Sequence, residues 1–82
     1  LNVEGGLLNF DTLNSRIGIG TTTPTATLDI AGSASIAGNL TFAAGIRNIQ
    51  AASNQALTLG GNTTGTIFIS PNNGTGLVDF ST

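Results

Sequence analysis

The segment RIGIGTTTPTATLDI, residues 16–30, carries the pattern that decides the fold. Near each end an apolar residue, one small or polar residue and a second apolar residue follow one another, as Ile-Gly-Ile at 17–19 and Leu-Asp-Ile at 28–30. This period of two is typical of a strand with one apolar face. Pro24 lies between the two patterns, and proline fixes its own φ and favours extended geometry in the residue before it. The segment therefore predicts a strand, a turn and a second strand.

Similar apolar pairs recur along the rest of the chain, 10 to 17 residues apart, with Gly, Asn, Thr, Ser or Pro between them. This spacing predicts many short strands joined by turns, and so an all-β fold. Residues 46–57 are predicted to form a strand, a turn and another strand, with a short helical turn as the alternative. The residues expected to form a shared assembly core are Ile17, Ile19, Leu28, Ile30, Ile36, Leu40, Phe42, Leu57, Leu59, Ile67, Ile69, Val78 and Phe80.

Glycine, proline and asparagine mark the places where the strands are expected to end. Glycine adopts positive φ at little cost, and the Asn-Gly pair at 73–74 suits a tight hairpin turn. The residues expected in turns are Gly18, Gly20, Pro24, Gly60, Gly61, Pro71, Asn73 and Gly74.

The composition leaves little material for a core within one chain. The chain has 82 residues, of which 39% are hydrophobic, and nine of these are Ala. Domains of this size are marginal without disulfides, metals or partner chains. Cys, His, Met, Trp and Tyr are all absent, so the sequence offers no disulfide, no thiolate ligand and no imidazole ligand. We therefore expect the missing stabilisation to come from other copies of the chain.

One internal similarity suggests a long repeat. Residues 6–12 (GLLNFDT) match residues 76–82 (GLVDFST) at four of seven positions, 70 residues further on. We interpret 1–82 as one β-rich segment excerpted from a longer chain, with about one unit at 6–75 and the first strand of the next at 76–82. On this hypothesis the Arg-Ile-Gly-Ile-Gly string of residues 16–20 recurs just beyond residue 82. A chance match between short strings is the alternative.

Two architectures give short strands of this kind a partner for their apolar face. One is an intertwined trimer, a β-helix or β-prism in which three chains direct Ile and Leu towards a common axis. The other is a single-chain β-solenoid. The irregular spacing of the apolar pairs disfavours the solenoid, because no fixed coil length repeats. The prediction is an elongated trimeric stalk.

The charge content narrows the range of partners. Only 7% of the residues are charged, both cations are Arg, and the net charge is −2. A chain with so few cations has little means of displacing counterions from phosphates, so nucleic acid is not expected as a partner. No apolar run is long enough to span a bilayer, and membrane insertion is not expected.

The sequence offers no convincing chemical site. Without His or Cys there is no base and no thiol for nucleophilic catalysis, and the four acids stand far apart at Glu4, Asp11, Asp29 and Asp79. We expect no catalytic residue, no metal site and no cofactor, and therefore no enzyme. Arg16 and Asp29 should both point away from the apolar face, so they are candidates for an ion pair between strands or chains.

Residues 16–42, RIGIGTTTPTATLDIAGSASIAGNLTF, resemble the VGIGT-x-x-P-x-x-x-LDV-x-G shaft repeats of large bacterial surface and secreted proteins and of phage tail-fibre-like proteins. The resemblance extends over residues 7–42, and more loosely over 67–80. It implies an extracellular location, at a cell surface or on a virion, and a homotrimeric shaft upstream of a C-terminal chaperone domain. Any distal glycan or receptor would bind outside this segment.

The sequence therefore predicts a structural shaft or stalk segment of an extracellular fibre or tail-fibre-like adhesin, which assembles with itself. One alternative is a glycan- or receptor-binding β module, although the chain lacks the Trp and Tyr on which sugar rings commonly stack. Another alternative is a subunit of a surface filament that polymerises end to end.

Overall fold

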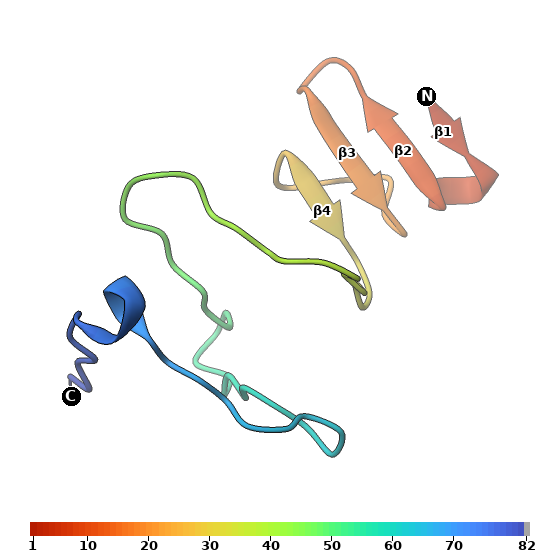
Figure 1. The fold of residues 1–82 in the computed structure, drawn as a ribbon. Helices are drawn as coiled ribbons and strands as arrows, with labels where there is room; N and C mark the ends of the chain where they lie inside the picture. The colour runs from red at the N-terminus through yellow and green to blue at the C-terminus, as the bar shows by residue number, and fades with distance from the viewer. Residues whose placement is uncertain (82) are drawn as a thin grey trace. The chain divides into compact units, whose positions relative to one another are not determined.

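The structure is a computed structural model that describes residues 1–81, and its regular part is one small four-stranded sheet (Figure 1). Its contacts divide the chain into two compact units, Leu1–Ala43 and Ala44–Thr82, and all four strands lie in the first. Among residues 1–81 there is no α-helix, only two 3-10 turns, η1 and η2. The elements are β1 (Asn2–Val3), η1 (Glu4–Gly6), β2 (Leu8–Asp11), β3 (Arg16–Ile19), β4 (Leu28–Ile30) and η2 (Pro71–Gly74).

Strands β1 and β2 form a hairpin around η1. Val3 lies opposite Leu8, and the pairing continues to Leu1, whose carbonyl accepts a hydrogen bond from the amide of Phe10 at 2.6 Å. The residues of η1 all have positive φ: 51° at Glu4, 61° at Gly5 and 101° at Gly6. Glycine adopts such angles without a steric penalty, and so the Gly-Gly pair lets the chain reverse within a few residues.

Strands β2 and β3 are antiparallel neighbours, joined by a turn at residues 12–15. The carboxylate of Asp11 closes this turn, because it accepts hydrogen bonds from the backbone amide of Asn14 at 3.2 Å and from its side-chain amide at 2.9 Å. Ser15 adopts a φ of 57°. Aspartate at the start of a turn commonly makes such local bonds, which compete with regular structure and end the strand.

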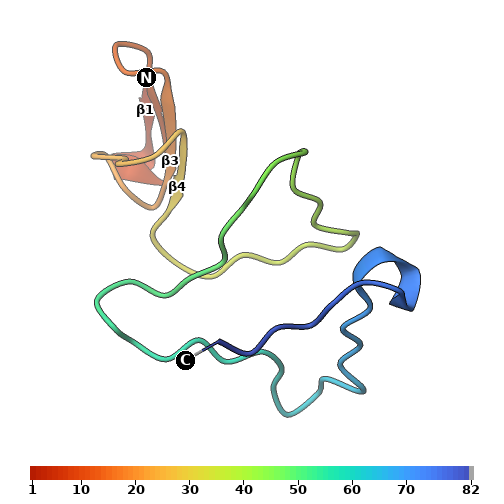
Figure 2. The ribbon, with the colours of Figure 1, turned by 90° about the vertical axis from the view of Figure 1, so that its left-hand side faces the viewer.

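Strand β4 lies parallel to β3, so the chain must return to the start of β3 before β4 begins. Residues 20–27 make this return as an extended crossover that bulges out on one side of the sheet when the sheet is viewed near its edge (Figure 2). The amide of Ile17 donates to the carbonyl of Thr27 at 2.7 Å, and the amide of Ala31 donates to the carbonyl of Ile19 at 2.9 Å. The crossover is shorter than the dozen or more residues usual for a parallel connection. It suffices because β3 and β4 are very short.

The second unit, Ala44–Thr82, contains turns but no strand among its described residues. The amide of Gln55 donates to the carbonyl of Ala52 at 3.2 Å, which confirms the turn predicted within residues 46–57. The strands predicted on either side of this turn are not present. Further turns occur at residues 61–64 and at η2.

The prediction of short strands is therefore confirmed for residues 17–19 and 28–30, and β2 confirms the strand that the repeat implied within residues 6–12, but the strands predicted after residue 30 are wrong for the single chain. The pairs Leu40/Phe42, Leu57/Leu59, Ile67/Ile69 and Val78/Phe80 all lie outside regular strands. A strand is defined by its hydrogen-bonded neighbour, and isolated two-stranded elements are marginal in water. These segments have the alternation of strands without a neighbour to bind.

Within the described residues the fold is a small mixed β-sheet together with coil, and most side chains are exposed. No large apolar side chain in residues 1–81 is buried. The chain is consistent with a fold that depends on an oligomer, because a sheet without a covered face lacks the burial that stabilises ordinary domains.

Candidate functional site

The sheet has one continuous apolar face, which the strand register defines. Leu8 lies opposite Ile19, which lies beside Ile30. Side chains alternate between the two faces of a strand, and directly paired residues share a face. Phe10 lies opposite Ile17, which lies beside Leu28, and these three residues are two positions along each strand from the first three, so they share the same face. The apolar face therefore consists of Val3, Leu8, Phe10, Ile17, Ile19, Leu28 and Ile30.

This face is open. Ile17 and Ile19 keep 38% and 40% of their surface exposed, and Leu28 keeps 56%. None of the seven side chains is buried, although large aliphatic residues at the centre of a sheet are usually covered. The apolar face also carries no charged residue. An uncharged, uncovered surface of this kind is typical of an interaction site.

The opposite, polar face is covered by the crossover of residues 20–27. Asn9 keeps only 8% of its surface exposed, and its side-chain amide donates to the carbonyl of Thr22 at 3.5 Å. Pro24 is buried, and its carbonyl accepts a hydrogen bond from Arg16 at 3.1 Å. The chain thus uses its own backbone to cover the polar face, and it leaves the apolar face uncovered.

Gly18 is what allows the crossover to approach the sheet. A Cβ atom added at Gly18 would lie 2.4 Å from the carbonyl oxygen of Thr21, which is backbone and cannot swing away. At Gly6 an added Cβ would lie 2.9 Å from the Thr22 methyl group. Gly18 therefore lies inside β3, not in the turn predicted for it, because the need there is for close approach of another backbone segment.

Of the thirteen residues predicted for the assembly core, the structure brings four together on the apolar face: Ile17, Ile19, Leu28 and Ile30. The other nine lie in exposed coil and share no strand. Val3, Leu8 and Phe10 belong to the apolar face but were not predicted as core residues. The alternation Leu8-Asn9-Phe10 was the signal that could have identified two of them.

The remaining predicted turn residues lie near bends or turns. Gly20 follows β3 with a φ of 77°, and Gly60 has a φ of 104° just before the turn at 61–64. Pro71, Asn73 and Gly74 lie in η2. Pro24 lies in the crossover and Gly61 at the start of its turn.

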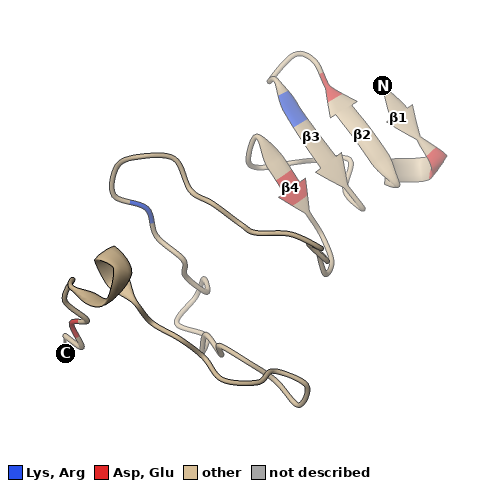
Figure 3. Cartoon of the chain, in the orientation of Figure 1, with Lys and Arg blue, Asp and Glu red and all other residues tan. Residues whose placement is uncertain are grey.

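The predicted pairing of Arg16 with Asp29 does not form within the chain. Arg16 binds the carbonyl of Pro24, whereas the carboxylate of Asp29 accepts bonds from the amide and the hydroxyl of Thr25 at 2.9 and 3.2 Å. The register places Arg16 opposite Asp11, one strand away from the predicted partner. Figure 3 shows the charged residues of the first unit spread over η1, β2, β3 and β4.

The structure lowers the pKa of Asp11. The side-chain hydrogen bond from Asn14 is the main reason that its pKa lies below the ordinary value of 3.8, with a further contribution from the Asn14 backbone amide. Slight desolvation opposes this, and the charge of Arg16 adds a minor lowering. Hydrogen bonds to the ionised carboxylate favour that form. The effect stabilises a turn and does not prepare an acid for catalysis.

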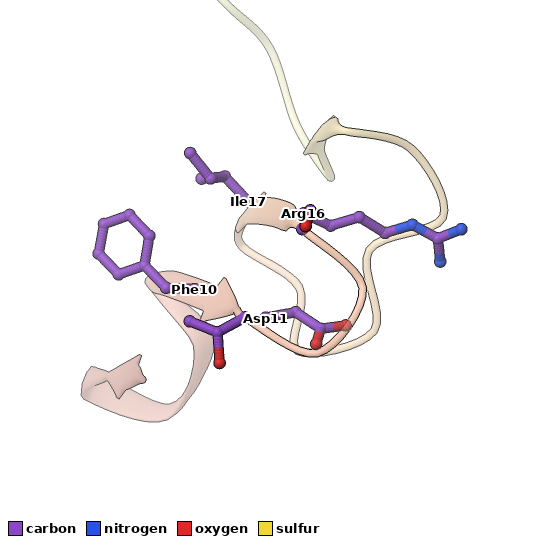
Figure 4. Close-up of a pocket in the computed structure, with 6 residues that line it drawn as sticks. Phe10, Asp11, Arg16 and Ile17 are labelled. Carbon is purple, nitrogen blue, oxygen red and sulfur yellow. The ribbon is translucent and has the colours of Figure 1, made fainter.

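A shallow hollow of about 350 Å³ lies at the β2–β3 turn (Figure 4). Phe10 and Ile17 project to one side of the view, whereas Arg16 extends to the other. The hollow is open, and its two apolar members belong to the apolar face already described. It has no buried polar group that would orient a ligand. Its lining residues are Phe10, Asp11, Thr12, Ser15, Arg16 and Ile17.

Residues 1–81 contain no cluster of three or more acidic side chains that could hold a metal ion. The same residues contain no helix with the length and apolar character of a membrane span. Comparisons with known protein families, with curated proteins and with solved structures give no match to this chain.

Proposed function

We propose that this chain is a structural shaft segment of an extracellular fibre, which assembles with itself through the apolar face. The observation that carries the proposal is that the sheet's polar face is covered, whereas its apolar face is exposed. The crossover covers Asn9 and Gly18 on the polar face, while Ile17 and Ile19 on the other face stay exposed. A sheet arranged in this way is complete only when a partner covers the apolar side.

The energetics favour a partner over solvent. Burying one Val, Leu, Ile or Phe side chain stabilises a structure by about 1.5–3 kcal/mol. The apolar face offers seven such side chains, and residues 1–81 contain no buried Val, Leu, Ile or Phe side chain that would stabilise the monomer instead. Association is therefore the step in which most of the hydrophobic stabilisation becomes available.

A second copy suits this face because the face bears no charge. Identical charged surfaces repel one another when they meet, whereas identical apolar surfaces do not. The nearest charged side chains, Asp11, Arg16 and Asp29, occupy alternate positions that point to the other face. Three copies around a common axis would cover each apolar face with the other two, so a homotrimer is the assembly that we propose.

The fibre and its extracellular location rest on the resemblance of residues 16–42 to shaft repeats. The low charge content supports the same role, since a stalk built from Thr, Gly, Asn and Ser packs closely through backbone and hydroxyl groups. In this role the segment holds a binding tip at a distance and does no chemistry itself.

Light scattering coupled to size exclusion tests the proposal directly. The expected mass is three times that of the 8.2 kDa chain, with a circular-dichroism spectrum dominated by β structure. A mass that stays at one chain over a wide concentration range, with the same β spectrum, would overturn it. A mass that grows without limit would replace the trimer with an end-to-end filament.

A further inference from the structure

The two 3-10 turns of the chain have the same unusual backbone. In η1 the residues Glu4, Gly5 and Gly6 all have positive φ, between 51° and 101°. In η2 the last three residues, Asn72, Asn73 and Gly74, also have positive φ, between 50° and 87°. Three consecutive residues of this kind are rare outside tight reversals of the chain. Residues 1–81 contain two such runs: the first ends at Gly6, the first residue of the matching segment 6–12, and the second ends at Gly74, two residues before the matching segment 76–82.

The residues that precede the two turns, 1–3 before η1 and 67–69 before η2, can also be compared. The hairpin at η1 joins Leu1-Asn2-Val3 to Leu8-Asn9-Phe10, two apolar alternations whose apolar members share one face. The turn η2 is flanked by Ile67-Phe68-Ile69 and Val78-Asp79-Phe80, of which the second has the same apolar-polar-apolar order and the first has apolar residues at the same two outer positions, with Phe68 where β1 has Asn2. The difference is the length of the turn, which is longer at η2. Thr82, the last residue of the second match, lies outside the described residues.

We propose that residues 67–80, which are coil and the turn η2 in the single chain, form a second hairpin of the β1–η1–β2 type when Val78–Phe80 binds a second copy of the segment Arg16–Ile30. In the first unit this place beside β2 is filled by β3. The inference rests on the proposed self-association. It identifies Val78–Phe80 as the strand to which another copy's segment Arg16–Ile30 would add, so that a second sheet forms there. It explains why Ile67, Ile69, Val78 and Phe80 carry a strand pattern without forming strands.

The hydrogen bonds of β2 show which backbone groups remain free for the partner. Phe10 exchanges both of its backbone bonds with Leu1, and so it faces β1. Leu7 accepts a bond from the amide of Gly20, on the β3 side. Because the direction alternates along a strand, Asn9 also faces β3, opposite Gly18. The equivalent of Asn9 is Asp79, whose backbone should therefore face the incoming strand.

The register also specifies the side chains of the partner. If the pairing follows that of β2 with β3, Ile17 of the incoming segment lies opposite Phe80, and its Ile19 lies opposite Val78. A glycine then faces Asp79. The Asp79 carboxylate cannot repeat the hydrogen bond that Asn9 donates to Thr22. Arg16 of the incoming segment lies diagonally opposite Asp79, within reach of a long side chain, so its charge complements the carboxylate.

A labelled peptide tests this docking site in the full chain. The probe is a synthetic peptide of residues 15–31 with a fluorophore at its N-terminus, and the measurement is fluorescence anisotropy. Binding to the unaltered chain is expected. The variant Asp79→Pro lacks the amide that should face the partner, and proline is tolerated at a strand edge. We expect its affinity for the peptide to be at least about tenfold lower, because each 1.4 kcal/mol is a factor of ten. Ala56→Pro, outside the hairpin, is the matched control and should bind as the unaltered chain does.

Substitutions in the peptide test the same site without altering the protein, in case Asp79→Pro disturbs its fold. A peptide with Gly18→Val cannot fold its crossover back on the strand, because a Cβ there meets the Thr21 carbonyl. It should bind at least about tenfold more weakly. A peptide with Ala26→Val, at an exposed position of the crossover, should bind normally. Equal binding of all three peptides would overturn the proposal.

The same samples separate this proposal from the shaft proposal. If light scattering shows trimers but Asp79→Pro binds the peptide as tightly as the unaltered chain, the hairpin site is wrong and the shaft stands. If the chain stays monomeric yet binds the peptide with the expected loss in Asp79→Pro, the hairpin site stands and the shaft is wrong.

Discussion

The two units of the chain, Leu1–Ala43 and Ala44–Thr82, have similar alternating sequences but different outcomes. In the first unit Ile17 and Ile19 lie in β3, whereas in the second Ile67 and Ile69 lie in coil. The residue between them differs: Gly18 in the first pair and Phe68 in the second. Glycine lets the crossover lie directly on β3, whereas residues 67–69 pair with no strand among the described residues. Alternation therefore specifies which face of a segment is apolar, but close approach of a neighbouring segment decides whether it becomes a strand.

The substitution Gly18→Val should leave the first unit, like the second, without its β3–β4 pairing. We expect it to lower the free energy of unfolding more than any of the other substitutions does. The added side chain collides with the Thr21 carbonyl, which should displace the crossover and release β4. We expect a loss of about 3 kcal/mol from the free energy of unfolding, at the upper end for overpacking. Urea denaturation followed by circular dichroism measures it at fixed chain concentration.

Gly32→Val is the control for this experiment, because nothing lies within 4 Å of a Cβ atom added there. Its unfolding free energy should stay within about 0.5 kcal/mol of the unaltered chain, as is usual for surface positions. If both variants lose the same stability, the crossover does not depend on Gly18.

The substitution Ile17→Asn tests whether the apolar face of the first unit is the surface that associates. It places a polar amide where the proposed trimer buries an aliphatic side chain, and should cost about 2 kcal/mol per chain. Sedimentation velocity should show trimers dissociating at higher concentration. Leu13→Asn is the matched control, because Leu13 is 90% exposed in the β2–β3 turn. Equal dissociation of both variants would argue against the face.

The substitution Asn9→Ala sharpens the account of the covered polar face. It removes the side-chain bond to the Thr22 carbonyl and leaves that carbonyl without this donor. The expected loss of unfolding free energy is about 1 kcal/mol. Asn2→Ala, at an exposed position of β1, should have a smaller effect in the same denaturation experiment. The reverse order would show that the crossover is not held through Asn9.

The smallest expected effect concerns pH and the β2–β3 turn. The pKa of Asp11 is lowered in the folded state, mainly by the Asn14 side chain, so its stabilisation is present above the unfolded value of 3.8 and is lost as pH falls through the lower folded value. Asn14→Ala should move the pKa of Asp11 back towards 3.8. NMR titration of the Asp11 carboxyl carbon measures this shift, and an unchanged midpoint would contradict the role of Asn14.

The sequence predicted β3 and β4 because residues 16–30 contain the alternation of apolar residues, although it placed Gly18 in a turn and not inside β3. It did not predict β1 and β2 as part of the same sheet, since Val3 and Leu8 come together only through the positive φ angles of η1. Nor did it predict that the strand patterns after Leu40 would stay unpaired in one chain. Periodicity identifies faces, but pairing depends on neighbours that can lie on another copy.

The candidate assembly surface was predictable only in part for the same reason. Ile17, Ile19, Leu28 and Ile30 were identified by their alternation, whereas Arg16 and Asp29 were assigned to each other without knowledge of the register. The crossover brings Arg16 to Pro24, and a local turn brings Thr25 to Asp29. Such backbone contacts leave no signal in the spacing of charged residues.

The most direct test of the central claim is the dependence of thermal unfolding on chain concentration, followed by circular dichroism. If the sheet is complete only when copies cover its apolar face, mass action requires the unfolding midpoint to rise steadily as the concentration increases. A midpoint that is the same at micromolar and millimolar concentration, for a cooperatively unfolding monomer, would contradict the account.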